Sequence, residues 1–145
     1  MQLLKSKAAT LGAPIVHGEE AVADKIFPGL HFGATKMNNN FALVDEVQKE
    51  VGATATIFVK SGDQFVRVAT NVINDDGSRF IGTTLDTKGK AMAAIAKGES
   101  YFGEADILGS SYVTGYEPIH DASSNVIGIC YVGYLKNFRS DAGCP

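Results

Sequence analysis

The sequence predicts an α+β fold built on a largely antiparallel sheet, and two patterns of apolar residues support this prediction. Between residues 37 and 51, apolar side chains recur every three or four positions, which is the spacing of an amphipathic helix. After residue 53 the period changes to two in several segments, which are separated by short turn sequences. Strands that follow one another through hairpin turns favour an antiparallel sheet over a parallel α/β arrangement.

The composition narrows the classes of function. The chain has 145 residues, the length of one domain, with 13 basic and 16 acidic residues and a net charge of −3. No basic stripe is present, so we expect no nucleic-acid partner. Three histidines and two cysteines without a CxxC motif predict no metal site, and we expect no cofactor.

The first 35 residues predict little regular structure. Residues 1–12 carry leucines and alanines at helical spacing before a glycine, and we expect them to be the last turns of a longer helix. Residues 11–35 are rich in glycine, proline and alanine and keep no period. They predict a loop with one or two short extended pieces, such as residues 29–33.

The clearest helix lies within residues 37–51. Its apolar face is formed by Met37, Phe41, Val44, Val47 and Val51. Asn38–Asn40 offer side-chain oxygens for the N-cap, and Gly52 can adopt the left-handed conformation that ends a helix.

Five strands and one short helix follow. Thr54–Lys60 and Gln64–Asn71 alternate on either side of a tight turn at 61–63 and predict a β-hairpin. Residues 72–87 predict a turn-rich loop, and the alanine-rich segment 88–97 predicts a short helix. The last three predicted strands are 100–107, 111–120 and 125–135.

No pattern in the sequence predicts catalysis. The GxSxG, HExxH and P-loop motifs are absent. The three histidines lie in unlike contexts, and the neighbouring acidic pairs lie in turns or on a polar helix face, where carboxylates are ordinarily solvated. We therefore expect a protein that is not an enzyme.

Arg67 is a candidate ligand-binding residue because it interrupts an apolar strand. Strict alternation divides this strand into one face with Phe65, Arg67 and Ala69 and another with Val66, Val68 and Thr70. If Arg67 points inward, its guanidinium needs an anion, since an unpaired buried charge is costly. If it points outward, it is an ordinary residue of a half-exposed sheet. The sequence leaves both alternatives open.

A second candidate group lies on a later strand. Tyr112, Thr114 and Tyr116 share one strand face by alternation, so three hydroxyl groups follow one another along it. They indicate either a small polar cavity or a solvent-facing sheet edge, where tyrosine and threonine are good strand formers.

Four phrases in fixed order resemble the Cache family of bacterial extracytoplasmic sensor domains. They are GATATIFVKSGDQFVRVATNV, DDGSRFIGTTLD, KGESYFGEADILGSSYVTGYEPIHD and NVIGICYVGYL, with FGATKMNNNFALVDEVQKEVG upstream. The resemblance covers about residues 28–135 and is greatest to the single Cache domains (Cache-3/Cache-2 type) of methyl-accepting chemotaxis proteins. It implies a PAS-like fold, in which an N-terminal helix and a short helix flank one face of a five- or six-stranded antiparallel sheet.

The resemblance also implies a small ligand between the sheet and the pocket loops. Arg67 falls where related sensor kinases hold a ligand carboxylate, and Thr114 falls where those kinases tend to carry a second basic residue. That departure favours a small monocarboxylate, such as acetate or pyruvate, over a di- or tricarboxylate. The candidate ligand-binding residues are Arg67, Thr114, Tyr116, Tyr101, Tyr112 and Thr70.

The resemblance finally implies an organisation for the chain. Residues 1–12 are expected to be the stub of a signalling helix, residues 13–135 a single Cache sensor domain, and residues 136–145 a linker or tail. The parent protein is then anchored in the bacterial inner membrane with this domain in the periplasm, and a homodimer through the N-terminal helix is compatible with it. The alternative is a free-standing soluble Cache-like binding protein, because the longest apolar runs are too short to span a bilayer.

Overall fold

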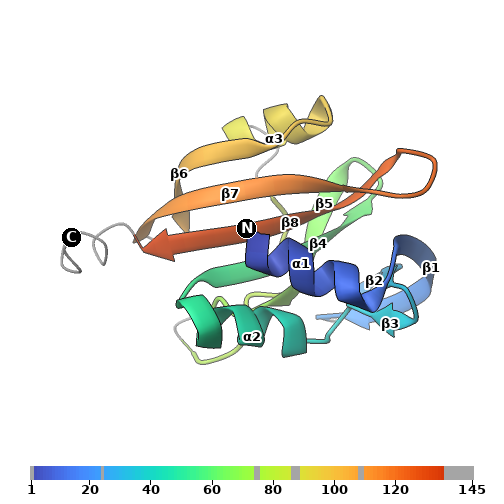
Figure 1. Cartoon of the computed structure of the whole chain (residues 1–145), viewed down its shortest axis with the longest axis horizontal. Coiled ribbons are helices and arrows are strands. Elements are labelled where there is room, and N and C mark those ends of the chain that lie inside the picture. The colour runs from blue at the N-terminus through green and yellow to red at the C-terminus, as the bar shows by residue number, and fades with distance from the viewer. Residues whose placement is uncertain (1, 24, 74–75, 86–88, 108–109, 136–145) are drawn as a thin grey trace.

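The computed structural model describes residues 2–23, 25–73, 76–85, 89–107 and 110–135. Its central sheet contains β4 (Thr54–Ser61), β5 (Gln64–Thr70), β6 (Tyr101–Ile107), β7 (Ser110–His120) and β8 (Val126–Leu135). These strands are antiparallel and lie in the order β5-β4-β8-β7-β6 (Figure 1). The α+β class and the five-stranded antiparallel sheet predicted from the sequence are therefore confirmed. The expected tail at 136–145 lies outside the described residues.

Three helices cover the two faces of this sheet. Helices α1 (Gln2–Leu11) and α2 (Ala42–Val51) pack on one face, and the short helix α3 (Lys90–Ala96) packs on the other (Figure 1). Strand β4 shows the division, because Ile57 belongs to the cluster with α1 and α2, whereas Phe58 belongs to the cluster with α3. The N-terminal helix and the short helix were expected on one face of the sheet, but the short helix lies on the opposite face, because its buried Ala91 and Ile95 belong to the cluster with Phe58.

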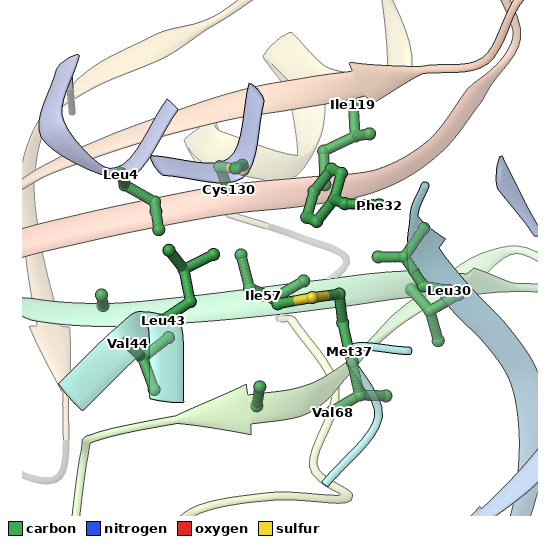
Figure 2. Close-up of a cluster of buried hydrophobic side chains, with 14 of the residues drawn as sticks. Leu4, Leu30, Phe32, Met37, Leu43, Val44, Ile57, Val68, Ile119 and Cys130 are labelled. Carbon is green, nitrogen blue, oxygen red and sulfur yellow. The ribbon is translucent and has the colours of Figure 1, made fainter. Parts of the chain in front are cut away.

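The core on the α1–α2 face is drawn from most of the chain. Figure 2 shows Leu4 of α1, Val44 of α2, Ile57 of β4 and Cys130 of β8 converging on one apolar layer. All four side chains are at most 5% exposed, so burial of this layer provides the main free energy that docks the two helices.

Residues 11–35 differ from the sequence prediction. They form two full strands, β1 (Pro14–Val22) and β2 (Lys25–Phe32). β2 pairs with β1 on one side and with the short β3 (Thr35–Lys36) on the other, in a separate sheet. Most side chains of β1 are exposed, and its register shifts between Val16 and Glu19. The bulge interrupts the alternation of side chains along β1, and its exposed positions do not require apolar residues. For both reasons the sequence of β1 shows no alternation of apolar and polar residues.

The three consecutive asparagines mainly join strands rather than cap α2, which begins at Ala42. Only Asn40 supports the helix start, accepting a hydrogen bond from the Ala42 N–H at 3.2 Å. The buried Asn38 side chain accepts from the Leu30 N–H, and the Asn39 side chain donates to the Ala21 carbonyl. The predicted end of the helix is confirmed, since Gly52 has a φ of 72° and donates to the Gln48 carbonyl.

A bulge in β5 changes which residues share a face. Ile57 of β4 pairs with Ala69 and Phe58 pairs with Arg67, so Val68 is an extra residue. The carbonyl of Val68 accepts a hydrogen bond from the backbone N–H of Asn39 at 2.8 Å. The prediction that Thr70 lies on the face opposite Arg67 is wrong, because the bulge shifts the alternation by one residue.

Candidate ligand-binding site

A row of hydroxyl groups crosses the whole central sheet on its α3 side. Tyr101 on β6 pairs with Tyr116 on β7, Tyr116 pairs with Tyr131 on β8, Tyr131 pairs with Thr56 on β4, and Thr56 pairs with Thr70 on β5. The strand register alone therefore places five hydroxyl-bearing side chains next to one another. Such a row offers donors and acceptors to a polar molecule lying on this face.

The three tyrosine rings of the row pack side by side. The ring centroids of Tyr116 and Tyr131 are 5.0 Å apart, and those of Tyr101 and Tyr116 are 6.1 Å apart. Glycines inside the strands leave room for the outer rings, because a Cβ on Gly103 would lie 2.6 Å from the Tyr101 hydroxyl and one on Gly133 would collide with the Tyr131 hydroxyl. These strand glycines therefore mark close packing against tyrosine side chains.

The threonines at the other end of the row are fully committed to hydrogen bonds. The hydroxyls of Thr56 and Thr70 are 2.7 Å apart, and that of Thr70 also accepts from the Val72 N–H. The Tyr131 hydroxyl lies 3.1 Å from that of Thr54. The hydroxyl of the 4%-exposed Tyr116, in contrast, makes no hydrogen bond with the described residues.

Arg67 lies beside this row, on the same face. Its guanidinium carbon is 5.0 Å from the ring centroid of Phe58 and 4.8 Å from that of Phe80, so the group lies close to two aromatic rings. Its Nη1 donates to the hydroxyl of Thr83 at 3.1 Å and to the carbonyl of Thr84 at 3.0 Å.

The charge of Arg67 has no acidic partner in the described part of the chain. No carboxylate of those residues lies within ion-pair distance, and Nε and Nη2 donate to none of them. Burial lowers the pKa of Arg67, although a guanidinium stays charged throughout the physiological range. Among the described residues, the partly buried positive charge of Arg67 is therefore contacted only by neutral groups.

A small cavity separates Arg67 from the tyrosines. Its volume is about 10 Å³, which is room for about one water molecule. Its walls are Thr56, Phe58, Arg67, Val72, Tyr116 and Tyr131. Burial raises the pKa of the Tyr116 and Tyr131 hydroxyls, so both are neutral hydrogen-bonding groups at pH 7.

Of the six predicted site residues, the structure brings Arg67 and Tyr116 to the cavity. Thr70 lies directly behind its wall, bonded to Thr56. Tyr101 packs against Tyr116 but aims its hydroxyl at the Glu104 carbonyl, 3.5 Å away. The remaining two do not line the cavity, since Thr114 donates its hydroxyl to the Gly103 carbonyl and Tyr112 packs at the border of the same cluster.

Four wall residues were not among the predicted ones: Thr56, Phe58, Val72 and Tyr131. The alternation within the first predicted strand contained a usable signal, because it places Thr56 and Phe58 on one face. Alternation also assigns Tyr131 to one face of the last predicted strand, but it does not show which of the two faces lies toward the ligand.

Two larger hollows lie along α1, away from Arg67. One, of about 350 Å³, runs between α1 and α2 and includes Lys7, which is already paired with Glu46 and Glu50. The other, of about 230 Å³, lies between the end of α1 and β7. Among their described lining residues, neither hollow has a buried basic side chain without an acidic partner, so we assign the candidate site to the smaller cavity beside Arg67.

The described residues have neither a metal-binding cluster nor a membrane-spanning helix. They contain no cluster of three or more histidine, cysteine or acidic side chains that could hold a metal ion. None of the helices among them has the length and apolar character needed to cross a membrane.

The chain matches the model of a known protein family. The family model described as the Cache 3/Cache 2 fusion domain matches residues 16–141. A search of curated proteins finds no match to the chain.

Proposed function

We propose that this chain, which belongs to the Cache 3/Cache 2 fusion domain family, senses a small organic anion that binds to Arg67. Domains of this family are sensors of small molecules rather than catalysts, and they are typically extracytoplasmic. The proposal adds to that family role a particular anchor residue and a particular class of ligand.

The observation that carries the proposal is the environment of Arg67. Its guanidinium is partly buried between Phe58 and Phe80, and its described hydrogen-bond partners, Thr83 and Thr84, are neutral. Taking a charge out of water without an opposite charge is costly, and a bound carboxylate offsets this cost through charge-assisted hydrogen bonds. Nε and Nη2, which donate to none of the described residues, provide the two parallel donors that a carboxylate prefers.

The remaining walls favour a ligand with a single carboxylate. Tyr116 and Tyr131 are neutral hydroxyls, and Arg67 is the only basic residue among the described walls of the cavity. A second carboxylate would therefore be buried without a positive partner. Acetate and pyruvate match this set of groups, with the Tyr116 hydroxyl free to donate to the carboxylate or to the keto oxygen of pyruvate.

We assign the wider setting on the basis of the family. The chain is the ligand-sensing part of a chemoreceptor of the methyl-accepting type or a related signalling protein in the bacterial inner membrane. In this arrangement residues 13–135 sense the ligand in the periplasm, and residues 1–12 are the stub of a signalling helix that offers a surface for a homodimer. Residues 136–145 are a linker or tail.

A thermal-shift series tests the proposed ligand class. Acetate, pyruvate, malate and citrate are added to the wild type and to Arg67→Gln, which keeps a polar side chain without the charge. A monocarboxylate at 100 times its dissociation constant is expected to stabilise the wild type by about 2.7 kcal/mol and Arg67→Gln far less. Equal stabilisation of both proteins, or a response to citrate alone, would contradict the proposal.

A further inference from the structure

The segment from Arg79 to Leu85, here called the strap, runs along the free edge of β5. The Gly82 N–H donates to the Arg67 carbonyl at 2.8 Å, the Arg67 N–H donates to the Thr83 carbonyl at 2.9 Å, and the Leu85 N–H donates to the Phe65 carbonyl at 3.0 Å. The strap therefore satisfies backbone groups that an edge strand otherwise leaves unpaired.

The strap also occupies the side chain of Arg67. Its Phe80 ring packs against the guanidinium, and its Thr83 hydroxyl and Thr84 carbonyl accept both Nη1 hydrogen bonds. These two neutral oxygens accept the hydrogen bonds that Nη1 would otherwise donate to the oxygens of a bound anion. Since the cavity beside Arg67 has a volume of only about 10 Å³, even acetate needs one of the surrounding segments to move.

The strap covers Arg67 and has fewer backbone hydrogen bonds to the sheet than the strands that line the cavity have to one another. Thr56, Phe58, Tyr116 and Tyr131 belong to strands that are paired within the central sheet. The strap, in contrast, has no regular secondary structure and pairs by its backbone with one edge of β5. Its side-chain attachment comes from Leu85, which is buried in the cluster on the α3 face, and from Ile81, which packs against the cluster on the other face. Segments that rely on few backbone bonds open locally at a lower cost in free energy than paired core strands.

One side chain holds the strap to a different part of the fold. Both terminal nitrogens of Arg79 donate to the Asp45 carboxylate of α2 at 2.9 Å, and Nη1 also donates to the Thr70 carbonyl at 3.0 Å. The guanidinium carbon lies 4.1 Å from the ring centroid of Phe41. This bidentate ion pair bridges the strap and α2 across the end of β5.

We propose that the strap moves off Arg67 when a carboxylate binds, and that the ion pair between Arg79 and Asp45 is the latch that sets how often the strap opens. This inference rests on the function proposed for Arg67. It makes the affinity of the sensor depend on two residues that do not touch the ligand: a weaker latch raises the open population and tightens binding.

The test compares the wild type with Asp45→Asn, which removes the charge of the latch and keeps the shape of the side chain. Hydrogen exchange of the Phe80, Gly82 and Leu85 amides is measured by NMR without ligand, and the dissociation constant for pyruvate is measured by calorimetry. If the strap is closed most of the time, both the exchange rates of these amides and the affinity for pyruvate are proportional to the fraction of molecules in which the strap is open. We expect exchange to accelerate and the dissociation constant to fall by one common factor of about two to five, the size expected for one partly exposed ion pair.

Glu46→Gln is the matched control. It changes the same charge at the next position of α2, but its partner is Lys7 rather than the strap. Strap exchange and pyruvate affinity are expected to stay at the wild-type values in this variant. The amides of Ile57 and Ile129, in the central sheet, report any change in global stability.

The possible results separate the latch, the gate and the ligand-binding role of Arg67. Unchanged strap exchange in Asp45→Asn, or equal acceleration at Ile57 and Ile129, overturns the latch. Faster strap exchange with an unchanged dissociation constant overturns the strap as a gate. If no acid binds the wild type while strap exchange still accelerates, the function proposed for Arg67 and the gate both fail, and the latch alone stands.

Discussion

Arg67 and Thr70 lie on the same face of β5, although strict alternation would place two residues three positions apart on opposite faces. The extra residue Val68 causes this, and its carbonyl is bonded to the Asn39 N–H. The bulge thereby completes a row of hydroxyls whose last member lies next to the charged Arg67. A local irregularity of one strand thus helps to assemble the candidate site.

We predict a strong energetic coupling between Thr56 and Thr70, whose hydroxyls are 2.7 Å apart and buried. Thr70→Val leaves the Thr56 hydroxyl and the Val72 N–H without their partner and should lower the free energy of unfolding by about 1–3 kcal/mol. The double variant with Thr56→Val should cost less than the sum of the two single changes, since both remove one shared bond.

Urea unfolding of the four proteins in this cycle measures the coupling. Thr70→Ser, which keeps the hydroxyl, serves as the control and should be the mildest change at this position. Strictly additive effects of the two valine substitutions would show that the two hydroxyls are energetically independent.

We predict that Gly133→Ala is destabilising because the new methyl group collides with the Tyr131 hydroxyl. Overpacking of this kind typically costs about 1–3 kcal/mol. Adding Tyr131→Phe removes the colliding oxygen and should recover part of the loss, which unfolding in guanidinium chloride measures. Without any recovery, the cost would have to come from the backbone of β8 instead of the contact with Tyr131.

The extent of prediction from sequence differed between the two sheets for a physical reason. The strands of the central sheet were predicted from runs of strand-forming residues between short turns, as in Thr54–Lys60. Both faces of β4 are covered, so its residues 55–59 are all buried. β1 was missed because most of its side chains are exposed and its pairing with β2 contains a register shift. Of β2, only an extended piece at residues 29–33 was predicted, since its buried residues do not alternate regularly with exposed ones. The sequence of β5 does not mark Val68 as a bulge residue, because it is apolar like most residues of this strand.

The candidate site was predictable only in part. An arginine within an apolar strand is a visible departure, and the family resemblance gave it a role. Thr83 and the Arg79–Asp45 ion pair were not predictable, because they depend on how an irregular loop folds back on an edge strand. Thr114 and Tyr112 carry the right chemistry, yet their positions along β7 direct them to neighbours other than the cavity.

We predict that carboxylate affinity is nearly constant between about pH 6 and pH 9. Arg67 stays charged in this range despite the lowering of its pKa by burial. Burial raises the pKa of Tyr116 and Tyr131 above the ordinary value of 10.0, so ionisation that would repel an anion begins only at higher pH. Calorimetric titration across this range provides the measurement. A loss of affinity with a midpoint near pH 7 would indicate a histidine anchor in place of Arg67.

The most direct test of the role of Arg67 is calorimetric titration of Arg67→Gln and Arg79→Gln with acetate and pyruvate. Both substitutions remove one guanidinium from neighbouring parts of the fold, so a general loss of positive potential affects them alike. If Arg67 anchors the ligand beneath a latched strap, Arg67→Gln loses measurable binding and Arg79→Gln binds about two- to fivefold more tightly than the wild type. Wild-type affinity in Arg67→Gln would contradict the proposed site.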